Sequence, residues 1–213
     1  MRRAARAGTN EELRLLIFLY LLSTPINTHK SHHVTKSAKR VHVRREDPCT
    51  DDAQLLLDEC TATLALFSGD GGQARFKLEE VCSARGAFVV ARTNKGAPLG
   101  CGAFRRFDYG VAELMRIYCR PDSGDTGQAI LNMLETEAVT AGYRTLIAQA
   151  NELNRRAVAF YERHGFERIE PAGASIHRGD VLCFARHMAS HPADDATDGK
   201  HADTGSTGHG ERH

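Results

Sequence analysis

One stretch decides the fold of this chain: RPDSGDTGQAILNMLE, residues 120–135. In it, a polar turn with two glycines leads directly into a segment whose apolar residues recur at helical spacing. The first backbone N–H groups of a helix lack partners within the helix, so this junction has the geometry of an anion site, and a pyrophosphate would fit it. Many helices follow a glycine without binding anything, so the neighbouring segments must decide between these interpretations.

Around this stretch the apolar pattern alternates between the periods of strands and helices. Turns at 94–96 and 108–110 predict an antiparallel meander of the strands that they join. The expected element order is β-α-α-β-β-β-α-β-α-β-β, a mixed sheet with helices on its faces. We predict strands at 41–44, 86–93, 98–107, 111–119, 144–150, 166–170 and 181–188, and helices at 47–67, 76–82, 126–142 and 154–164.

The length of 213 residues suits one domain with tails. We expect the domain at 40–189, an appendage at 1–39 that is poorly ordered or a short helix, and a disordered, histidine-containing tail at 190–213. The apolar run at 15–22 is too short to span a bilayer and no signal-peptide cleavage site follows it, so we expect no membrane partner. A secretion signal, a docking helix, a targeting remnant and a misassigned start codon stay open for this appendage.

The charge balance argues against a strongly basic or acidic class of protein. The 28 Lys and Arg residues nearly equal the 27 Asp and Glu residues, so no overall field favours nucleic acid or an anionic membrane. The basic segment 29–46 admits an interpretation as a nucleic-acid arm, but no interleaved aromatic residues offer base stacking there. We therefore expect no nucleic-acid partner.

The cysteines form no C-x-x-C pair and no zinc-type group with histidine, so we expect no metal site. We interpret them as reduced thiols of the core, which favours a cytoplasmic location. They are Cys49, Cys60, Cys82, Cys101, Cys119 and Cys183.

Three segments follow one another in the order of a known family: GAPLGCGAFRRFDYGVAELMRIYCRP at 96–121, SGDTGQAILNMLE at 123–135 and NELNRRAVAFYERHGFERI at 151–169. Together they resemble the GNAT superfamily of acetyl-CoA-dependent N-acetyltransferases, and the likeness covers most of residues 41–188. Its most specific part is the pattern A-x-x-F-Y-x-x-x-G-F at 157–166.

The resemblance implies an α+β fold whose mixed, mostly antiparallel central sheet is flanked by helices and splayed in the middle to admit the co-substrate acetyl-CoA. In the family, the main chain of the central strand pairs with the pantetheine arm, here at Ile117, Tyr118 and Cys119. A Q/R-x-x-G-x-G/A loop wraps the pyrophosphate. It maps onto Gly124, Asp125, Thr126, Gly127, Gln128 and Ala129.

The loop departs from the family pattern at its mouth. Gly124 stands where the family has Arg or Gln, and Asp125 follows where relatives commonly have glycine. A carboxylate at a helix N-terminus is an ordinary cap, so Asp125 would satisfy the donors that a phosphate needs. The expected loss of cofactor binding free energy is about 1 to 3 kcal/mol. Arg120 would partly substitute by turning toward the phosphates, and Asp125 would alternatively point to solvent.

Three further residues carry the expected chemistry. The resemblance places Tyr161 as the general acid that protonates the departing thiolate, although a Tyr beside Phe is more often core packing. It makes Asn154 a side-chain contact to the cofactor arm, whereas a helix cap is the structural alternative. Glu113 is either the base, acting through water, or an exposed residue or an ion pair with Arg116 or Arg105; by strict alternation it shares a face with 115, 117 and 119.

The leading hypothesis is an N-acetyltransferase that moves the acetyl group of acetyl-CoA directly to an amine of a small molecule or protein. The alternative is a degenerate acyl-CoA-binding or regulatory domain, with weak or no transfer because of Gly124 and Asp125. The sequence does not name the acceptor, and we expect a monomer or a homodimer.

Overall fold

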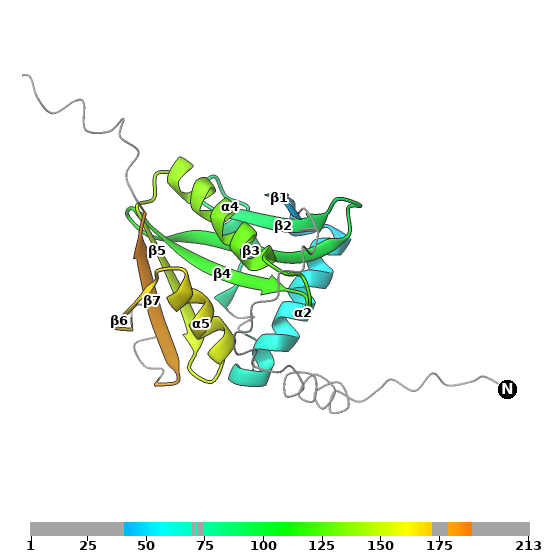
Figure 1. Cartoon of the computed structure of the whole chain (residues 1–213). Helices are drawn as coiled ribbons and strands as arrows, with labels where there is room; N and C mark the ends of the chain where they lie inside the picture. Colours follow the sequence, from blue (N-terminus) through cyan, green and yellow to red (C-terminus); the bar gives the residue numbers. More distant parts are fainter. Residues whose placement is uncertain (1–40, 70, 72–74, 172–178, 189–213) are drawn as a thin grey trace, which may run out of the picture.

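The computed structural model describes residues 41–69, 71, 75–171 and 179–188. The predicted appendage at 1–39 and the predicted tail at 190–213 lie outside the described residues. The described chain forms a seven-stranded sheet in the order β1-β2-β3-β4-β5-β7-β6, with helices on both of its faces (Figure 1). Every neighbouring pair is antiparallel except β4 and β5, which are parallel. This arrangement confirms the predicted α+β fold and its mostly antiparallel sheet.

The observed elements follow the predicted order, and most of their ends differ from the prediction by only a few residues. The helices begin after turns or caps that the sequence carries, such as Thr50 before α2 and Asn154 before α5. The elements are β1 (Val41–Arg45), α2 (Asp51–Ser68), α3 (Leu78–Val81), β2 (Ala87–Thr93), β3 (Pro98–Asp108), β4 (Val111–Cys119), α4 (Thr126–Thr140), β5 (Thr145–Asn151), α5 (Arg155–Arg163), β6 (Glu167–Ile169) and β7 (Val181–His187).

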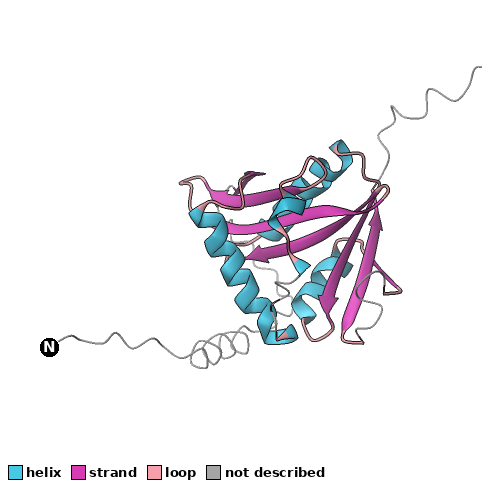
Figure 2. Cartoon of the chain, turned by 180° about the vertical axis from the view of Figure 1, so that it is seen from behind, coloured by secondary structure: helices cyan, strands magenta, loops and turns pink. Residues whose placement is uncertain are grey.

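Alternation along the strands builds one apolar core on each face of the sheet. On β2, Val89 faces the core that includes Ile130 and Leu134 of α4, while Val90 faces the core that includes Leu56 of α2. Helix α4 therefore covers the face turned forward in Figure 1, and α2 covers the face seen in Figure 2. These two buried cores fix the sheet between the helices.

The sheet opens in its middle. The parallel ladder between β4 and β5 pairs only 111–113 with 145–147, although both strands continue beyond it. The two strands diverge, and α5 lies beside the opening (Figure 1). The far half of β4 therefore presents backbone groups on that edge which the β5 ladder does not use.

A bulge at Arg116 corrects one prediction about β4. The pairing with β3 jumps from Tyr118 to Met115, and Arg116 has a φ of 53°, so an extra residue is inserted into this strand. Met115 and Tyr118 pack against the α2 core, whereas Ile117 packs against the α4 core. Strict alternation is thus wrong here, and Glu113 and Met115 do not share a face with residues 117 and 119.

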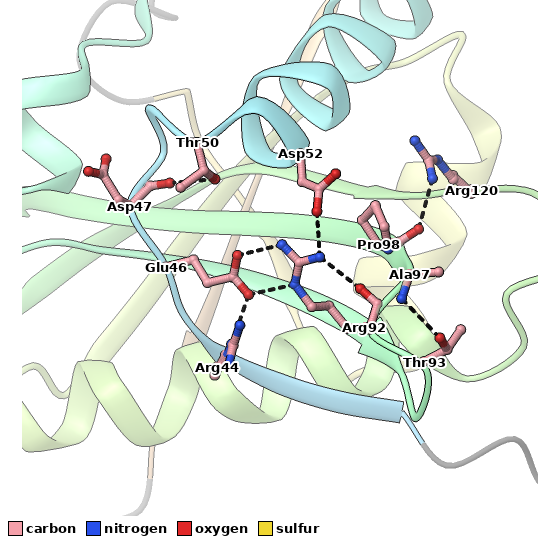
Figure 3. Close-up of polar contacts among 11 residues, drawn as sticks. Arg44, Glu46, Asp47, Thr50, Asp52, Arg92, Thr93, Ala97, Pro98 and Arg120 are labelled. Atoms are coloured by element: carbon pink, nitrogen blue, oxygen red, sulfur yellow. Dashed lines mark hydrogen bonds and ion pairs between the residues drawn. The ribbon is translucent and has the colours of Figure 1, made fainter.

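A network around Arg92 fixes the start of α2 against the sheet (Figure 3). The Arg92 guanidinium donates to both carboxylate oxygens of Glu46 at 2.7 Å, to Asp52 at 2.6 Å and to the carbonyl of Gly96 at 2.8 Å. Thr50 takes the N-cap position of α2, but its hydroxyl donates to the Asp47 carbonyl and makes no cap hydrogen bond. The arginine therefore joins the segment after β1, the β2–β3 turn and α2.

Among the described helices, none has the length and apolar character that crossing a membrane would require.

Candidate active site

A cleft of about 650 Å³ lies where β4 and β5 separate. Its walls come from the end of β4, the loop before α4, the inner side of α5 and the middle of α2. Clefts between about 300 and 1,000 Å³ are typical of small-molecule sites. A long ligand can therefore lie between the open edge of β4 and helix α5.

Most of the residues predicted to bind the cofactor meet in this cleft. It is lined by Ile117, Tyr118, Cys119, Gly124, Asp125, Gly127, Gln128 and Asn154, and by the predicted acid Tyr161. Arg120, Thr126 and Ala129 are not among the described residues that line it.

The loop before α4 leaves the helix start accessible. Helix α4 begins at Thr126 as predicted, and Gly124 has a φ of +63°, a conformation that glycine adopts without strain. The Asp125 side chain is exposed and makes no cap hydrogen bond, so the predicted cap is wrong. The first N–H groups of α4 therefore do not have the carboxylate as their partner.

Gly127 is small for a steric reason. A Cβ atom at this position would lie 3.1 Å from Cε2 of Phe160 and 3.6 Å from Sγ of Cys119. The start of α4 therefore approaches both α5 and the end of β4 closely, which a larger side chain would prevent.

Arg120 and Thr126 point away from the predicted phosphate position. The Arg120 guanidinium donates to both carboxylate oxygens of Glu59 on α2, at 2.7 to 3.2 Å. It also donates to the Pro98 carbonyl at 2.8 Å (Figure 3). The Thr126 hydroxyl is buried and donates to the Ser123 carbonyl at 2.6 Å. Arg120 thus contacts α2 and β3. The prediction that it turns toward the phosphate loop is therefore wrong for this structure.

The cations of the cleft come from α5, which the sequence interpretation missed. Arg156 and Arg163 both line the cleft and are seven residues apart, about two helical turns. The guanidinium group of neither residue makes a hydrogen bond or ion pair with another described residue. Arg156 acts on its surroundings, because its positive charge lowers the pKa of Cys119 and so opposes the effect of burial. This period of seven was the signal in the sequence, since it aligns both arginines along one side of the helix.

Tyr161 lies at the inner end of the cleft, on the buried side of α5. It is only 7% exposed, and its ring packs edge-on against Phe160 and Phe166. Burial, and secondarily Cys60 and Glu113, raise the pKa of the phenol well above its usual value. The hydroxyl therefore keeps its proton at neutral pH, which is the form that a general acid needs.

Asn154 caps α5, as the structural alternative supposed. Its side-chain oxygen accepts a hydrogen bond of 3.1 Å from the N–H of Ala157, and the residue also lines the cleft. The cap uses the oxygen of the side-chain amide, so its NH₂ group is left to donate a hydrogen bond to a ligand.

A smaller pocket of about 160 Å³, called the inner pocket below, adjoins the cleft and shares Tyr161, Ile117 and Asn154 with it. Glu113 lines it and is 2% exposed. The Arg105 guanidinium donates to Oε2 of Glu113 at 2.8 and 2.9 Å, and Oε1 lies 3.9 Å from Nη2 of Arg75. Of the alternatives for Glu113, the ion pair with Arg105 is therefore present, and the pair with Arg116 and the exposed position are not.

The thiols near the cleft are protonated. Burial raises the pKa of Cys119 to about 11 and also raises the pKa of Cys60, so neither forms a ready thiolate at neutral pH. All of the cysteines are free, but Cys49 and Cys82 are exposed, which corrects their assignment to the core. In the described part of the chain, no three His, Cys, Asp or Glu side chains are grouped to hold a metal ion.

Comparison with known proteins agrees with this geometry. The model of the Acetyltransferase (GNAT) family matches residues 56–166. An IAA acetyltransferase from Azospirillum brasilense is 27% identical over 136 residues, which cover 62% of this chain and 88% of that protein.

Solved structures share the fold. An acetyltransferase of the GNAT family from Staphylococcus aureus superposes with a TM-score of 0.57 at 14% identity, covering 70% of this chain and 99% of that one. The PaiA N-acetyltransferase from Thermoplasma acidophilum, solved in complex with coenzyme A, gives a TM-score of 0.55 at 14% identity over 70% of this chain and 99% of that one.

Proposed function

Because the chain belongs to the GNAT acetyltransferase family and is therefore an acyl-CoA-dependent transferase, we propose that it transfers the acetyl group of acetyl-CoA to an amine. The observation that carries this proposal is the cleft between β4 and β5, which joins an open strand edge, an accessible helix start and a buried phenol. The structural neighbour that was solved with coenzyme A supports acetyl-CoA as the co-substrate.

The cleft offers separate partners for the two parts of acetyl-CoA. The backbone of Ile117, Tyr118 and Cys119 on the open edge of β4 suits the amide groups of the pantetheine arm. The N-terminus of α4 at 124–128 suits the pyrophosphate, since its N–H groups and its dipole favour an anion. Arg156 and Arg163 supply the positive charge that Gly124 does not.

The chemistry follows from the groups at the inner end. The amine nitrogen attacks the thioester carbon, a C–N bond forms, the C–S bond breaks and its electron pair stays on sulfur. The protonated Tyr161 donates its proton to that sulfur and is then reprotonated from the nitrogen through water. An ammonium acceptor also loses one further proton, for which Glu113 is the candidate acceptor through its Oε1 side.

Two observations weigh against a degenerate, non-transferring domain. The exposed Asp125 makes no hydrogen bond that caps α4, so it does not close the helix start. The missing loop cation has substitutes in Arg156 and Arg163. The class of acceptor, an amine of a small molecule or protein, stays a prediction, as does the oligomeric state, monomer or homodimer. A cytoplasmic location is proposed because acetyl-CoA is an intracellular metabolite.

The test is calorimetric titration of acetyl-CoA into the full-length protein, followed by a thiol-release assay with a panel of amines. Micromolar binding and amine-dependent release of free coenzyme A are expected. Binding without release for any amine would favour the degenerate alternative, and absence of binding would refute both. The Asp125→Gly variant, titrated beside it, should bind a few-fold more tightly because it removes a negative charge near the phosphates.

A further inference from the structure

We propose that the inner pocket binds a small acceptor that carries a carboxylate beside its amine, with the Arg75 guanidinium as the partner of the carboxylate. This inference rests on the proposed function, because it names the class of acceptor for the same reaction. It depends on three observations: the charges around the pocket, its size, and the position of its polar groups relative to Tyr161.

The charges around the pocket are mainly positive. Arg105 is shared between Glu113 and Glu80, and Nζ of Lys77 lies 3.9 Å from Oε1 of Glu80, so these two glutamates have two cations as partners besides Arg75. Arg75 donates to the neutral side chain of Gln149 at 2.7 Å, and its nearest carboxylate oxygen is 3.9 Å away on Glu113. Its remaining donors thus have no short contact to a carboxylate of the described chain.

Arg116 adds a second positive charge to the wall. It is 8% exposed, and it donates to the carbonyl of Gly71 at 2.8 Å and to the hydroxyl of Thr61 at 3.2 Å. Its guanidinium carbon lies 5.1 Å from the centre of the Phe76 ring. These partners are neutral, and no carboxylate of a described residue pairs with it. The pocket wall therefore carries two arginines against one glutamate.

An anionic group on the acceptor would compensate this excess. A guanidinium and a carboxylate form strong, charge-assisted hydrogen bonds, often through two parallel N–H donors. A polyamine would bring only positive charge next to Arg75 and Arg116, so the same wall disfavours it. The charge of the pocket thus selects among amines.

Size and position add a second restriction. At about 160 Å³ the pocket is well below the range of ordinary ligand sites, so it suits a small acceptor. Arg75 and Glu113 lie in the same pocket as Tyr161, which also lines the cofactor cleft. A carboxylate held at Arg75 would therefore leave an amine on the same small molecule free to point toward Tyr161 and the thioester.

The experiment compares matched pairs of ligands. N-acetylated amino acids and the corresponding N-acetylated carboxamides, which are products of the proposed reaction, are titrated into the full-length protein saturated with coenzyme A. The same pairs are titrated into Arg75→Gln and into the control Arg106→Gln, which removes an equal charge from an exposed position of β3 outside the pocket. Acetyl-CoA titration of both variants checks that they are folded.

We expect the best acid to bind about tenfold or more tightly than its amide in the native protein and in Arg106→Gln. In Arg75→Gln the two should bind alike. Equal binding of acids and amides by the native protein, no binding of either series, or an acid preference that survives in Arg75→Gln would each overturn the inference. Because the assay measures product binding, it is independent of turnover, so a failure of acetyl transfer appears separately in the thiol-release assay.

Discussion

Replacing Arg156 with glutamine should weaken acetyl-CoA binding about 5- to 30-fold. In the cleft, Arg156 is exposed and its guanidinium forms no ion pair or hydrogen bond with another described residue, so its charge is available to a phosphate. A charge-assisted hydrogen bond contributes about 1.5 to 3 kcal/mol, and an exposed ion pair at most about 1 kcal/mol. In a half-open cleft the contact should contribute an energy between these limits. A loss of about 1 to 2 kcal/mol corresponds to a 5- to 30-fold increase in Kd.

The assay is calorimetric titration of acetyl-CoA at low and at raised salt, with Arg155→Gln as the control. Arg155 is the adjacent residue of α5, is also exposed and is not among the residues that line the cleft, so its variant loses the same charge. The native protein should lose affinity as salt rises, and Arg156→Gln should lose less, because one phosphate contact is already gone. S-acetylpantetheine, which lacks the phosphates, should bind both variants alike.

Two results would refute this reasoning about α5. An equal loss of affinity in Arg155→Gln and Arg156→Gln would mean that only the general charge of the helix matters. An unchanged Kd in Arg156→Gln would mean that its guanidinium does not reach the phosphates, and that the α4 N-terminus holds them without a side-chain cation.

Three further predictions follow from single contacts. Tyr161→Phe should lower kcat at least tenfold with little change in the Kd of acetyl-CoA. Because burial raises the pKa of the phenol, the rate of the native enzyme should not fall on the alkaline side before about pH 10. A rate in the variant equal to the native rate would remove the phenol from the mechanism. Gly127→Ala should weaken acetyl-CoA binding several-fold, since its Cβ would lie 3.1 Å from Phe160. The free energy of unfolding from thermal denaturation should change by only about 1 kcal/mol, because alanine favours the helix. Unchanged affinity would contradict a close approach of the loop to the ligand. Arg92→Ala should lower the free energy of unfolding in urea by about 2 kcal/mol. Because hydrogen bonding to Arg92 lowers the pKa of Glu46 in the folded state, this contribution should be present above the pKa of Glu46 in the unfolded chain and disappear as the pH falls through its pKa in the folded protein. A difference in stability between native protein and variant that does not depend on pH would argue against this pair as its source.

Much of the fold was predictable because its determinants are local. The apolar periods of β2 and α4, and the turns at 94–96 and 108–110, each depend on a few neighbouring residues. The start of α4 at Thr126 was predicted for the same reason, since the polar turn before it, which contains Gly124, is visible in the sequence. These elements then have few ways to pack with an apolar face on each side of one sheet.

The parts of the site that escaped prediction depend on partners far apart in the chain. Arg120 is 61 residues from Glu59, and no local pattern reveals that this carboxylate would hold the guanidinium away from the loop. Arg156 and Arg163 were visible as a period of seven, but the sequence does not say which side of α5 faces the opening in the sheet. Long-range contacts thus decided which cations serve the cleft.

The bulge at Arg116 shows why one unpredicted backbone feature matters for the whole site. Arg116 is not a glycine, so its positive φ leaves no mark in the sequence, yet it reverses which side chains at 117–119 face α4. In a regular strand, the ring of Tyr118 would point toward the start of α4 and Cys119 would point toward α2. Since a Cβ on Gly127 would already lie 3.6 Å from the sulfur of Cys119, a tyrosine ring in that place would push the helix start away from β4. The bulge therefore lets the loop before α4 approach the open edge of the strand, and it does so while Glu113, before the bulge, stays in the inner pocket.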